Sequence, residues 1–170
     1  EPSHVRVKEY SLINENLPNS FNGLKIVHFS DIHYGRTIEL SQLKKIVKKI
    51  NELKPDVVIF SGDLLDNPKI SEIDLNKIQD QLYDIQAKFK KYAIVGDSDY
   101  FDKDKYITLM ESADFLVLDN SNDLLYYNEN KPLMFIGTSS LLEKEHDLDQ
   151  SLITEENNEE YLGSFITNPV

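Results

Sequence analysis

Three short acidic motifs, each directly after an apolar run, contain the residues of this sequence best suited to chemistry. The motifs read SDIH, GDLLD and GDSD, and the candidate metal ligands in them are Asp31, His33, Asp63 and Asp97. Carboxylates that gather at one place repel one another unless cations lie between them. Oxygen and imidazole ligands suit Mn, Fe, Zn or Mg, and a carboxylate shared by two ions about 3.5–4 Å apart provides a site for phosphoryl transfer.

The segments before the motifs indicate how the fold brings them together. The runs 24–29, 57–60 and 92–95 are short, apolar and rich in β-branched residues, which is typical of buried strands. Apolar residues recur at helical spacing over 40–53, and a second helix is expected over 71–89. In open α/β sheets, ligands bind beyond the carboxyl ends of the strands. The three motifs are therefore predicted to share one edge of a sheet.

The remaining elements follow from the same patterns. We expect further strands at 5–12, 115–118, 124–127, 133–136 and 165–166, and a short helix at 103–112. The acidic, Asn- and Glu-rich stretch 141–160 is predicted to be mobile. The alternation of strands and helices indicates a single α/β domain over residues 1–170, with the three apolar runs as the central strands of a mixed sheet.

The composition excludes several classes of protein and of site. The chain has 170 residues with 30 acidic and 18 basic side chains, a net charge of −12, and Arg6 and Arg36 as its only arginines. Binding of nucleic acid through charge is excluded, because that needs a basic surface. The absence of cysteine excludes disulfides, thiolate nucleophiles and cysteine-ligated zinc. No run in the sequence approaches the roughly 18 apolar residues that a membrane span needs.

Together and in this order, the three motifs resemble those of the calcineurin-like metallophosphoesterase family. The resemblance covers residues 24 to about 136 and rests on DIH at 31–33, GDLLD at 62–66 and GDSD at 96–99. The surrounding GLKIVHFSDIHYG and PDVVIFSGDLLD are most similar to the bacterial, often membrane-anchored branch. The resemblance implies the α/β/β/α sandwich of that family, with this chain as its N-terminal half or a little more. It also implies a full-length protein that is tethered to a membrane by a preceding helix or is cytoplasmic.

The resemblance assigns a role to each candidate ligand. It implies that Asp31 and His33 hold a first metal ion, that Asp63 bridges two ions and that Asp97 holds the second. The ions would be Mn, Fe or Zn, one or two of them, and a metal-bound hydroxide would attack phosphorus. The substrate implied is a phosphorylated small molecule or a lipid-linked pyrophosphate.

The third motif departs from the family pattern, which is usually Gly-Asn-His followed by Asp or Glu. Asp97 stands in place of the asparagine, and Ser98 stands at the position of the usual catalytic histidine. A hydroxyl cannot replace imidazole as a general acid near neutral pH, and that step is typically worth about 10²–10⁴ in rate. Thr167 stands where a further ligand of the second metal is expected, and the final Gly-His-x-His motif of the family is absent from the sequence.

Two hypotheses about function follow. In the first, the chain belongs to a phosphohydrolase with a remodelled second metal position, acting on a substrate with a good leaving group such as a pyrophosphate. In the alternative, it is a catalytically degenerate relative that acts as a binding or regulatory module. Because the chain would be only part of the family domain, an exposed sheet edge and self-association are expected.

Three further residues in or near the motifs are expected to have structural roles rather than to bind metal. His28, within the strand predicted at 24–29, is expected to be a hydrogen-bonded core residue. Asp66 is expected to support the ligands by hydrogen bonding. Asp99 is expected to cap the helix that follows it.

Overall fold

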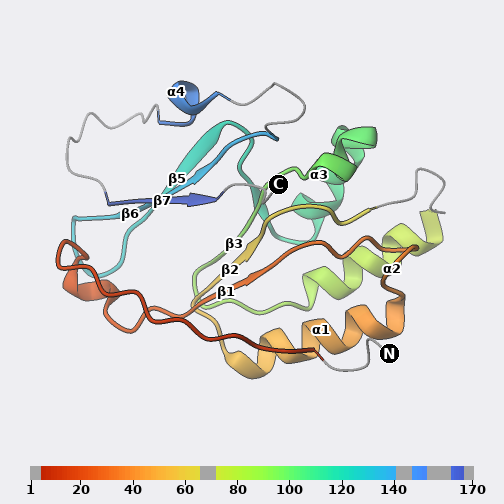
Figure 1. Ribbon diagram of the computed structural model, residues 1–170, viewed down its shortest axis with the longest axis horizontal. Coiled ribbons are helices and arrows are strands. Elements are labelled where there is room, and N and C mark those ends of the chain that lie inside the picture. The colour runs from red at the N-terminus through yellow and green to blue at the C-terminus, as the bar shows by residue number, and fades with distance from the viewer. Residues whose placement is uncertain (1–4, 66–71, 141–146, 153–161, 167–170) are drawn as a thin grey trace.

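Two sheets and a layer of helices form the described part of the chain, which comprises residues 5–65, 72–140, 147–152 and 162–166 of the computed structural model (Figure 1). The first sheet is entirely parallel, with strands in the order β1 (Ile26–Phe29), β2 (Val57–Phe60), β3 (Lys90–Ala93) and β4 (Leu116–Val117). Its crossovers contain α1 (Leu40–Leu53), α2 (Glu72–Tyr83) and α3 (Lys103–Ser112). Because every strand runs in the same direction, all four carboxyl ends lie at one edge.

The second sheet contains strands of both directions. It consists of β5 (Ser121–Leu125), β6 (Leu133–Gly137) and β7 (Leu162–Ile166), with β5 antiparallel and β7 parallel to the central β6. The short helix α4 (Leu148–Ser151) lies beside β5, where the Asn122 side chain donates to the carbonyl of Ser151 at 2.6 Å. The predicted α/β class is confirmed. The mixed strand directions, however, occur in the second sheet, whereas the three predicted central strands lie in the parallel one.

The parallel sheet separates two hydrophobic cores. Val58 and Phe60 of β2 belong to the core shared with the helices, and Val57 and Ile59 belong to the core between the two sheets. Successive side chains of a strand point to opposite faces, so both faces of this strand are buried. This explains why the central strands read as continuous apolar runs rather than as alternating patterns.

Helix α1 coincides with its predicted bounds. At its start, the Gln42 side chain accepts the N–H of Glu39 at 2.8 Å. At its end, Lys54 adopts a left-handed φ of 51°, and Pro55 follows. The residues that α1 buries recur at helical spacing and are Leu43, Val47 and Ile50.

Helix α2 ends earlier than predicted, at Tyr83 instead of residue 89. The Asn51 side chain of α1 donates to the carbonyl of Asp84 at 2.9 Å and accepts the N–H of Gln86 at 2.8 Å. These bonds occupy backbone groups that a continuing helix would need. The chain therefore leaves the helix and enters β3 at Lys90, two residues before the predicted strand.

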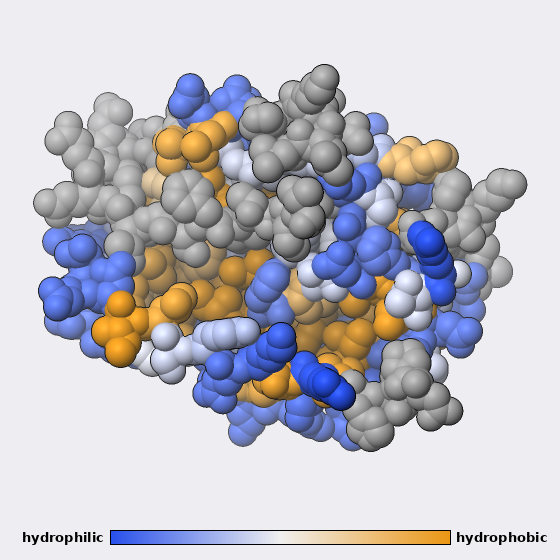
Figure 2. All heavy atoms as spheres, viewed as in Figure 1, coloured by the Kyte–Doolittle hydropathy of each residue, from blue (hydrophilic) through white to orange (hydrophobic). Residues whose placement is uncertain are grey.

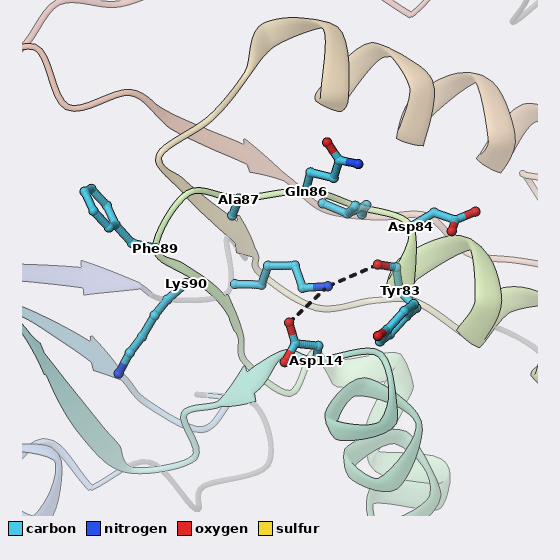
Figure 3. A pocket seen from close by; sticks show the side chains of 9 residues that line it. Tyr83, Asp84, Gln86, Ala87, Phe89, Lys90 and Asp114 are labelled. Atoms are coloured by element: carbon cyan, nitrogen blue, oxygen red, sulfur yellow. Dashed lines mark hydrogen bonds and ion pairs between the residues drawn. The ribbon is translucent and has the colours of Figure 1, made fainter.

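The amino edge of the parallel sheet holds a buried cation. The Lys91 ammonium donates to the carbonyl oxygens of Ala113 at 2.7 Å and Tyr83 at 3.4 Å, and lies 3.7 Å from the Asp114 carboxylate, at a pocket of about 540 Å³ (Figure 3). Tyr83 ends α2, and Ala113 caps the C-terminus of α3. The cation therefore lies where two helix dipoles favour positive charge. Burial lowers the pKa of Lys91, although Asp114 acts in the opposite direction.

Residues 5–14 do not form the predicted first strand. The segment is irregular, and the side chains of Tyr10 and Leu12 are 78% and 91% exposed. Alternating apolar residues favour a strand only where a neighbour pairs with them and one face is buried. Among the described residues, no strand pairs with this segment.

The other predicted elements are confirmed with small shifts. The strands expected at 115–118 and 133–136 are β4 and β6, β5 begins three residues before the strand expected at 124–127, and residues 165–166 lie within β7. The predicted helix at 103–112 coincides with α3. Within 141–160, the described residues 147–152 include α4; the remainder lies outside the described residues, so its mobility stays a prediction. Among the helices that the structure describes, none combines the length and apolarity needed to cross a membrane.

Candidate metal centre

The carboxyl edge of the parallel sheet brings three of the four predicted ligands together. Asp31 and His33 follow β1, Asp63 follows β2, and one potential ligand atom of each lies within 4.8 Å of the others. Nε2 of His33 is 3.7 Å from Oδ1 of Asp31. Two carboxylates and an imidazole suit a divalent cation such as Mn, Fe or Zn. The donor chemistry and the spacing therefore fit one metal ion between these loops.

The backbone of these three residues adopts an unusual conformation. The φ angles are 55° at Asp31, 42° at His33 and 61° at Asp63, in the left-handed region that residues other than glycine rarely adopt. Such residues persist only where the surrounding structure holds them, and they cluster at functional sites. The N–H of Asp31 donates to the carbonyl of Gly62 at 3.1 Å, and the N–H of His33 to that of Asp63 at 3.0 Å. These bonds hold the two loops side by side where the side chains converge.

Two glycines allow the loops after β2 and β3 to approach closely. A Cβ atom on Gly62 would collide with the backbone of Gly96, and a Cβ atom on Gly96 would collide with the backbone of Asp63. Gly62 also has a φ of 89°, which glycine adopts at little cost. The Gly-Asp pairs of the second and third motifs thus reflect the packing of one loop on the other.

The third motif does not add its carboxylate to the cluster. Asp97 lies outside the group of three, and its Oδ1 accepts a hydrogen bond from the hydroxyl of Ser140, which follows β6. Ser98 contacts the cluster through Asp63, because its N–H and its hydroxyl donate to Oδ1 of Asp63 at 2.9 and 3.1 Å. The metal role of Asp97 and the catalytic role of the Ser98 position therefore stay predictions.

Asp99 is buried against the loop that carries Asp63, with only 2% of the residue exposed. The N–H of Gly96 donates to its Oδ2 at 3.1 Å, so Asp99 caps the start of the 3₁₀ helix Asp97–Asp102, in which it lies. The predicted cap of the helix that follows is wrong, because the N-cap residue of α3 is Asp102. Three N–H groups of the loop after β2 also donate to Asp99, at 2.8, 3.0 and 3.2 Å, and belong to Asp63, Leu64 and Leu65. The sequence did not indicate these three bonds. Burial raises the pKa of Asp99 to about 7, although the backbone hydrogen bonds act to lower it.

The polar residues that follow β6 were not among the predicted site residues. Thr138, Ser139 and Ser140 are all buried, and the Ser139 hydroxyl donates to Asp119. β6 is itself an apolar run that ends in polar residues. Because ligands bind beyond the carboxyl ends of strands, the polar residues after β6 could have been predicted as site residues in the same way.

The predictions for His28, Asp66 and Thr167 can be compared with the structure only in part. Nε2 of His28 lies 2.7 Å from the Ser61 hydroxyl, so the ring is hydrogen-bonded as expected. His28 is exposed rather than part of the core, because the core between the sheets takes no buried residue from β1. Asp66 and Thr167 lie outside the described residues.

Comparisons with known proteins agree with this arrangement. The family model described as calcineurin-like phosphoesterase matches residues 24–162. The chain is 31% identical over 144 residues to the uncharacterized metallophosphoesterase YkuE of Bacillus subtilis, a match that covers 84% of this chain and 50% of that protein. It is 35% identical over 126 residues to a transmembrane protein with metallophosphoesterase domain from Danio rerio, covering 73% and 28%.

A third relative carries a more specific name. The chain is 33% identical over 103 residues to the UDP-2,3-diacylglucosamine pyrophosphatase LpxG of Chlamydia trachomatis, a match that covers 59% of this chain and 30% of that protein. The chain thus spans half or less of the length of these relatives. The family match includes all three strand-end motifs and the whole parallel sheet. The chain therefore belongs to the calcineurin-like phosphoesterase family.

Proposed function

We propose that the chain is the N-terminal part of a divalent-metal-dependent phosphohydrolase domain, with Asp31, His33 and Asp63 as metal ligands. The observation that carries the proposal is the convergence of their ligand atoms within 4.8 Å from two separate loops. Membership of the family supports hydrolysis of a phosphoester and the use of a divalent metal. The oxygen and imidazole donors favour Mn, Fe or Zn, as one ion or two.

The roles of the side chains follow from charge and position. A bound divalent cation supplies positive charge to phosphoryl oxygens and lowers the pKa of water. The carboxylates of Asp31 and Asp63 balance that charge, and their left-handed backbone directs them to one point. Asp97 is proposed as a ligand of a second ion, which requires its carboxylate to exchange the Ser140 hydroxyl for the metal.

The residue at the position of the family's catalytic histidine restricts the proposed substrates. Ser98 has a hydroxyl there, and that hydroxyl donates to Asp63 at 3.1 Å. Because it supplies no general acid near neutral pH, we expect a substrate with a good leaving group. We therefore propose a phosphorylated small molecule, and in particular a lipid-linked pyrophosphate. The relative named UDP-2,3-diacylglucosamine pyrophosphatase supports this class, and the relative named as a transmembrane protein supports a membrane-associated full-length protein.

The alternative function is that of a binding or regulatory module with a degenerate site. The observation that favours it is the hydrogen bonding of the third motif. Asp97 is bound by Ser140, and Oδ1 of Asp63 is bound twice by Ser98. These bonds occupy carboxylate oxygens that a second metal would need. In this alternative the chain keeps at most the first ion and catalyses no hydrolysis.

We also propose that the 170-residue chain self-associates. Large apolar side chains that are exposed in the described residues include Tyr10, Leu12, Ile13 and, on the edge strand β1, Ile26. Figure 2 shows hydrophobic residues at the surface in the middle of one face. Exposed apolar surface and an open sheet edge both favour association. Sedimentation velocity should show the chain shifting to dimers or larger species as its concentration rises, and a monomer at every concentration would contradict this.

A metal titration tests the proposed function directly. We expect Mn or Zn, titrated calorimetrically into the chain, to bind with a stoichiometry of one or two ions and Asp31→Ala to abolish the binding. We also expect the full-length protein to hydrolyse bis-p-nitrophenyl phosphate in the presence of Mn. Metal binding without hydrolysis by the full-length protein would favour the binding module, and absence of metal binding would overturn the proposed site.

A further inference from the structure

We propose that Asp99 is a positioning residue, whose carboxylate holds the loop after β2 in the conformation that presents Asp63 to the metal. The inference rests on the proposed function, because this positioning has a consequence for chemistry only if Asp63 is a ligand. Asp99 is not part of the described ligand group, so it acts through Asp63.

The backbone N–H groups of the loop after β2 point toward the Asp99 carboxylate. Three consecutive N–H groups, those of Asp63, Leu64 and Leu65, donate to the two oxygens of Asp99 at 2.8 to 3.2 Å. Successive N–H groups converge on one anion only where the backbone curls into a concave turn that contains left-handed residues. Gly62 and Asp63 have φ angles of 89° and 61°. The carboxylate therefore stabilises the same left-handed conformation that aims the Asp63 side chain.

One short turn binds Asp63 both through its backbone and through its side chain. The N–H of Ser98 donates to the carboxylate of Asp63 at 2.9 Å, while the neighbouring Asp99 accepts the backbone N–H of Asp63 at 2.8 Å. Main chain and side chain of Asp63 are thus both fixed by the 3₁₀ helix after β3. A shift of this helix would move the carboxylate relative to Asp31 and His33.

Burial strengthens the hydrogen bonds of the Asp99 carboxylate. Asp99 is 2% exposed, so water does not compete for its oxygens, and hydrogen bonds are stronger in such surroundings. The N–H of Gly96 adds a fourth bond from the residue that packs directly on Gly62. The Asp99 carboxylate is therefore bound to the backbone on both sides. Gly96 holds it on the side of β3, and it holds the loop after β2.

The test compares Asp99→Asn with a control of similar destabilisation away from the site. Asparagine keeps the size of aspartate but turns an NH₂ group toward N–H donors, so it loses bonds on one side. We expect Mn affinity, measured calorimetrically where both chains are folded, to fall about 10–100-fold, as for other residues that orient metal ligands. Val47→Ala removes buried volume in α1, since Val47 is 4% exposed, and should leave Mn affinity within about twofold.

Amide hydrogen exchange of the metal-free chain gives a readout that needs no metal. In Asp99→Asn, we expect the amides of residues 63–65 to exchange faster, whereas Val47→Ala should leave them close to the original rates. If Asp99→Asn weakened Mn binding no more than Val47→Ala, the inference would be overturned. If the unsubstituted chain bound no Mn, the proposed function would fail. Unchanged exchange of the amides of residues 63–65 in Asp99→Asn would then show that Asp99 does not position the loop after β2 either. Should Asp99→Asn fail to fold, Asp99→Glu, which keeps the charge but displaces both oxygens, replaces it with the same expected directions.

Discussion

The two edges of the parallel sheet place charged side chains in opposite surroundings. At the carboxyl edge, Asp31, Asp63 and His33 converge within 4.8 Å on a left-handed backbone. At the amino edge, Lys91 is buried and donates to two helix-terminal carbonyls beside an opposite charge. The first arrangement gathers like charges and strain, whereas the second satisfies its charge within the protein.

This difference separates residues proposed to bind a metal from residues that stabilise the fold. Like charges and left-handed residues lower the free energy of unfolding, and the proposed metal would compensate that cost. A buried cation with several acceptors at helix C-termini is compensated within the protein, and its removal leaves those acceptors without their donor. Substitutions at the carboxyl edge should therefore change metal affinity, and those at the amino edge should change stability.

The largest effect is expected for Asp63→Asn. The substitution removes the charge of a proposed ligand, so Mn affinity should fall by more than about 100-fold, beyond the usual cost of losing a residue that only supports a ligand. Without metal, the melting temperature should stay the same or rise, because repulsion with Asp31 is relieved. Calorimetric titration and thermal denaturation in EDTA measure the two effects. A large drop in the melting temperature in EDTA would contradict the division between the two edges.

The opposite pattern is expected for Lys91→Met. Loss of the ammonium leaves the buried carbonyl of Ala113 without its 2.7 Å donor, so the free energy of unfolding should fall by about 1–3 kcal/mol. Mn affinity should be unchanged, because Lys91 lies at the edge of the sheet away from the motifs. Urea denaturation and calorimetry test both statements, and weaker Mn binding would show that the edges are coupled.

The pH dependence of stability sharpens the same contrast. Burial lowers the pKa of Lys91 below the value it has in the unfolded chain. Between these two pKa values, Lys91 is protonated in the unfolded chain but largely deprotonated in the folded one. The contribution of Lys91 to the free energy of unfolding therefore increases with pH and is complete above the pKa that Lys91 has in the unfolded chain. Denaturation at a series of alkaline pH values should show a more positive slope for the original chain than for Lys91→Met. Equal slopes would mean that the lysine titrates normally.

The smallest effects are expected for Ser98 of the third motif and for Ser140, which donates to Asp97 of that motif. Ser98→Ala removes the hydroxyl donor to Asp63 but keeps the N–H donor at 2.9 Å, so Mn affinity at the first position should change by less than about threefold. Ser140→Ala removes the hydrogen bond to Asp97 and should favour uptake of a second, weaker ion. Native mass spectrometry with Mn counts the ions. A large loss at the first position in either variant would show that the third motif belongs to the first metal.

Local patterns predicted the parts of the fold that they control. The apolar runs, the amphipathic helix 40–53 and the polar residues after each strand predicted that Asp31, His33 and Asp63 lie at one edge, as they do in the structure. This succeeded because parallel strands joined by helices must bring their carboxyl ends to the same side. The family membership predicted from the motifs is confirmed as well.

The failures share a cause, which is that they depend on contacts between distant segments. The run 5–12 has a strand pattern but no described partner strand, and α2 ends where Asn51, from another helix, binds the backbone. Likewise, Asp97 and Asp99 belong to one motif, yet one side chain meets Ser140 and the other meets the loop after β2.

The sequence by itself determined the class of fold, the family and the place where three candidate ligands converge, because those depend on periodicity and on residue types at strand ends. Only the tertiary structure decided which carboxylates face the cluster and which are bound inside the protein. Hydrogen bonds between loops as far apart in the chain as those of Asp63 and Asp99 depend on β2 and β3 lying side by side in the sheet. Their directions therefore depend on packing that no local pattern of residues specifies.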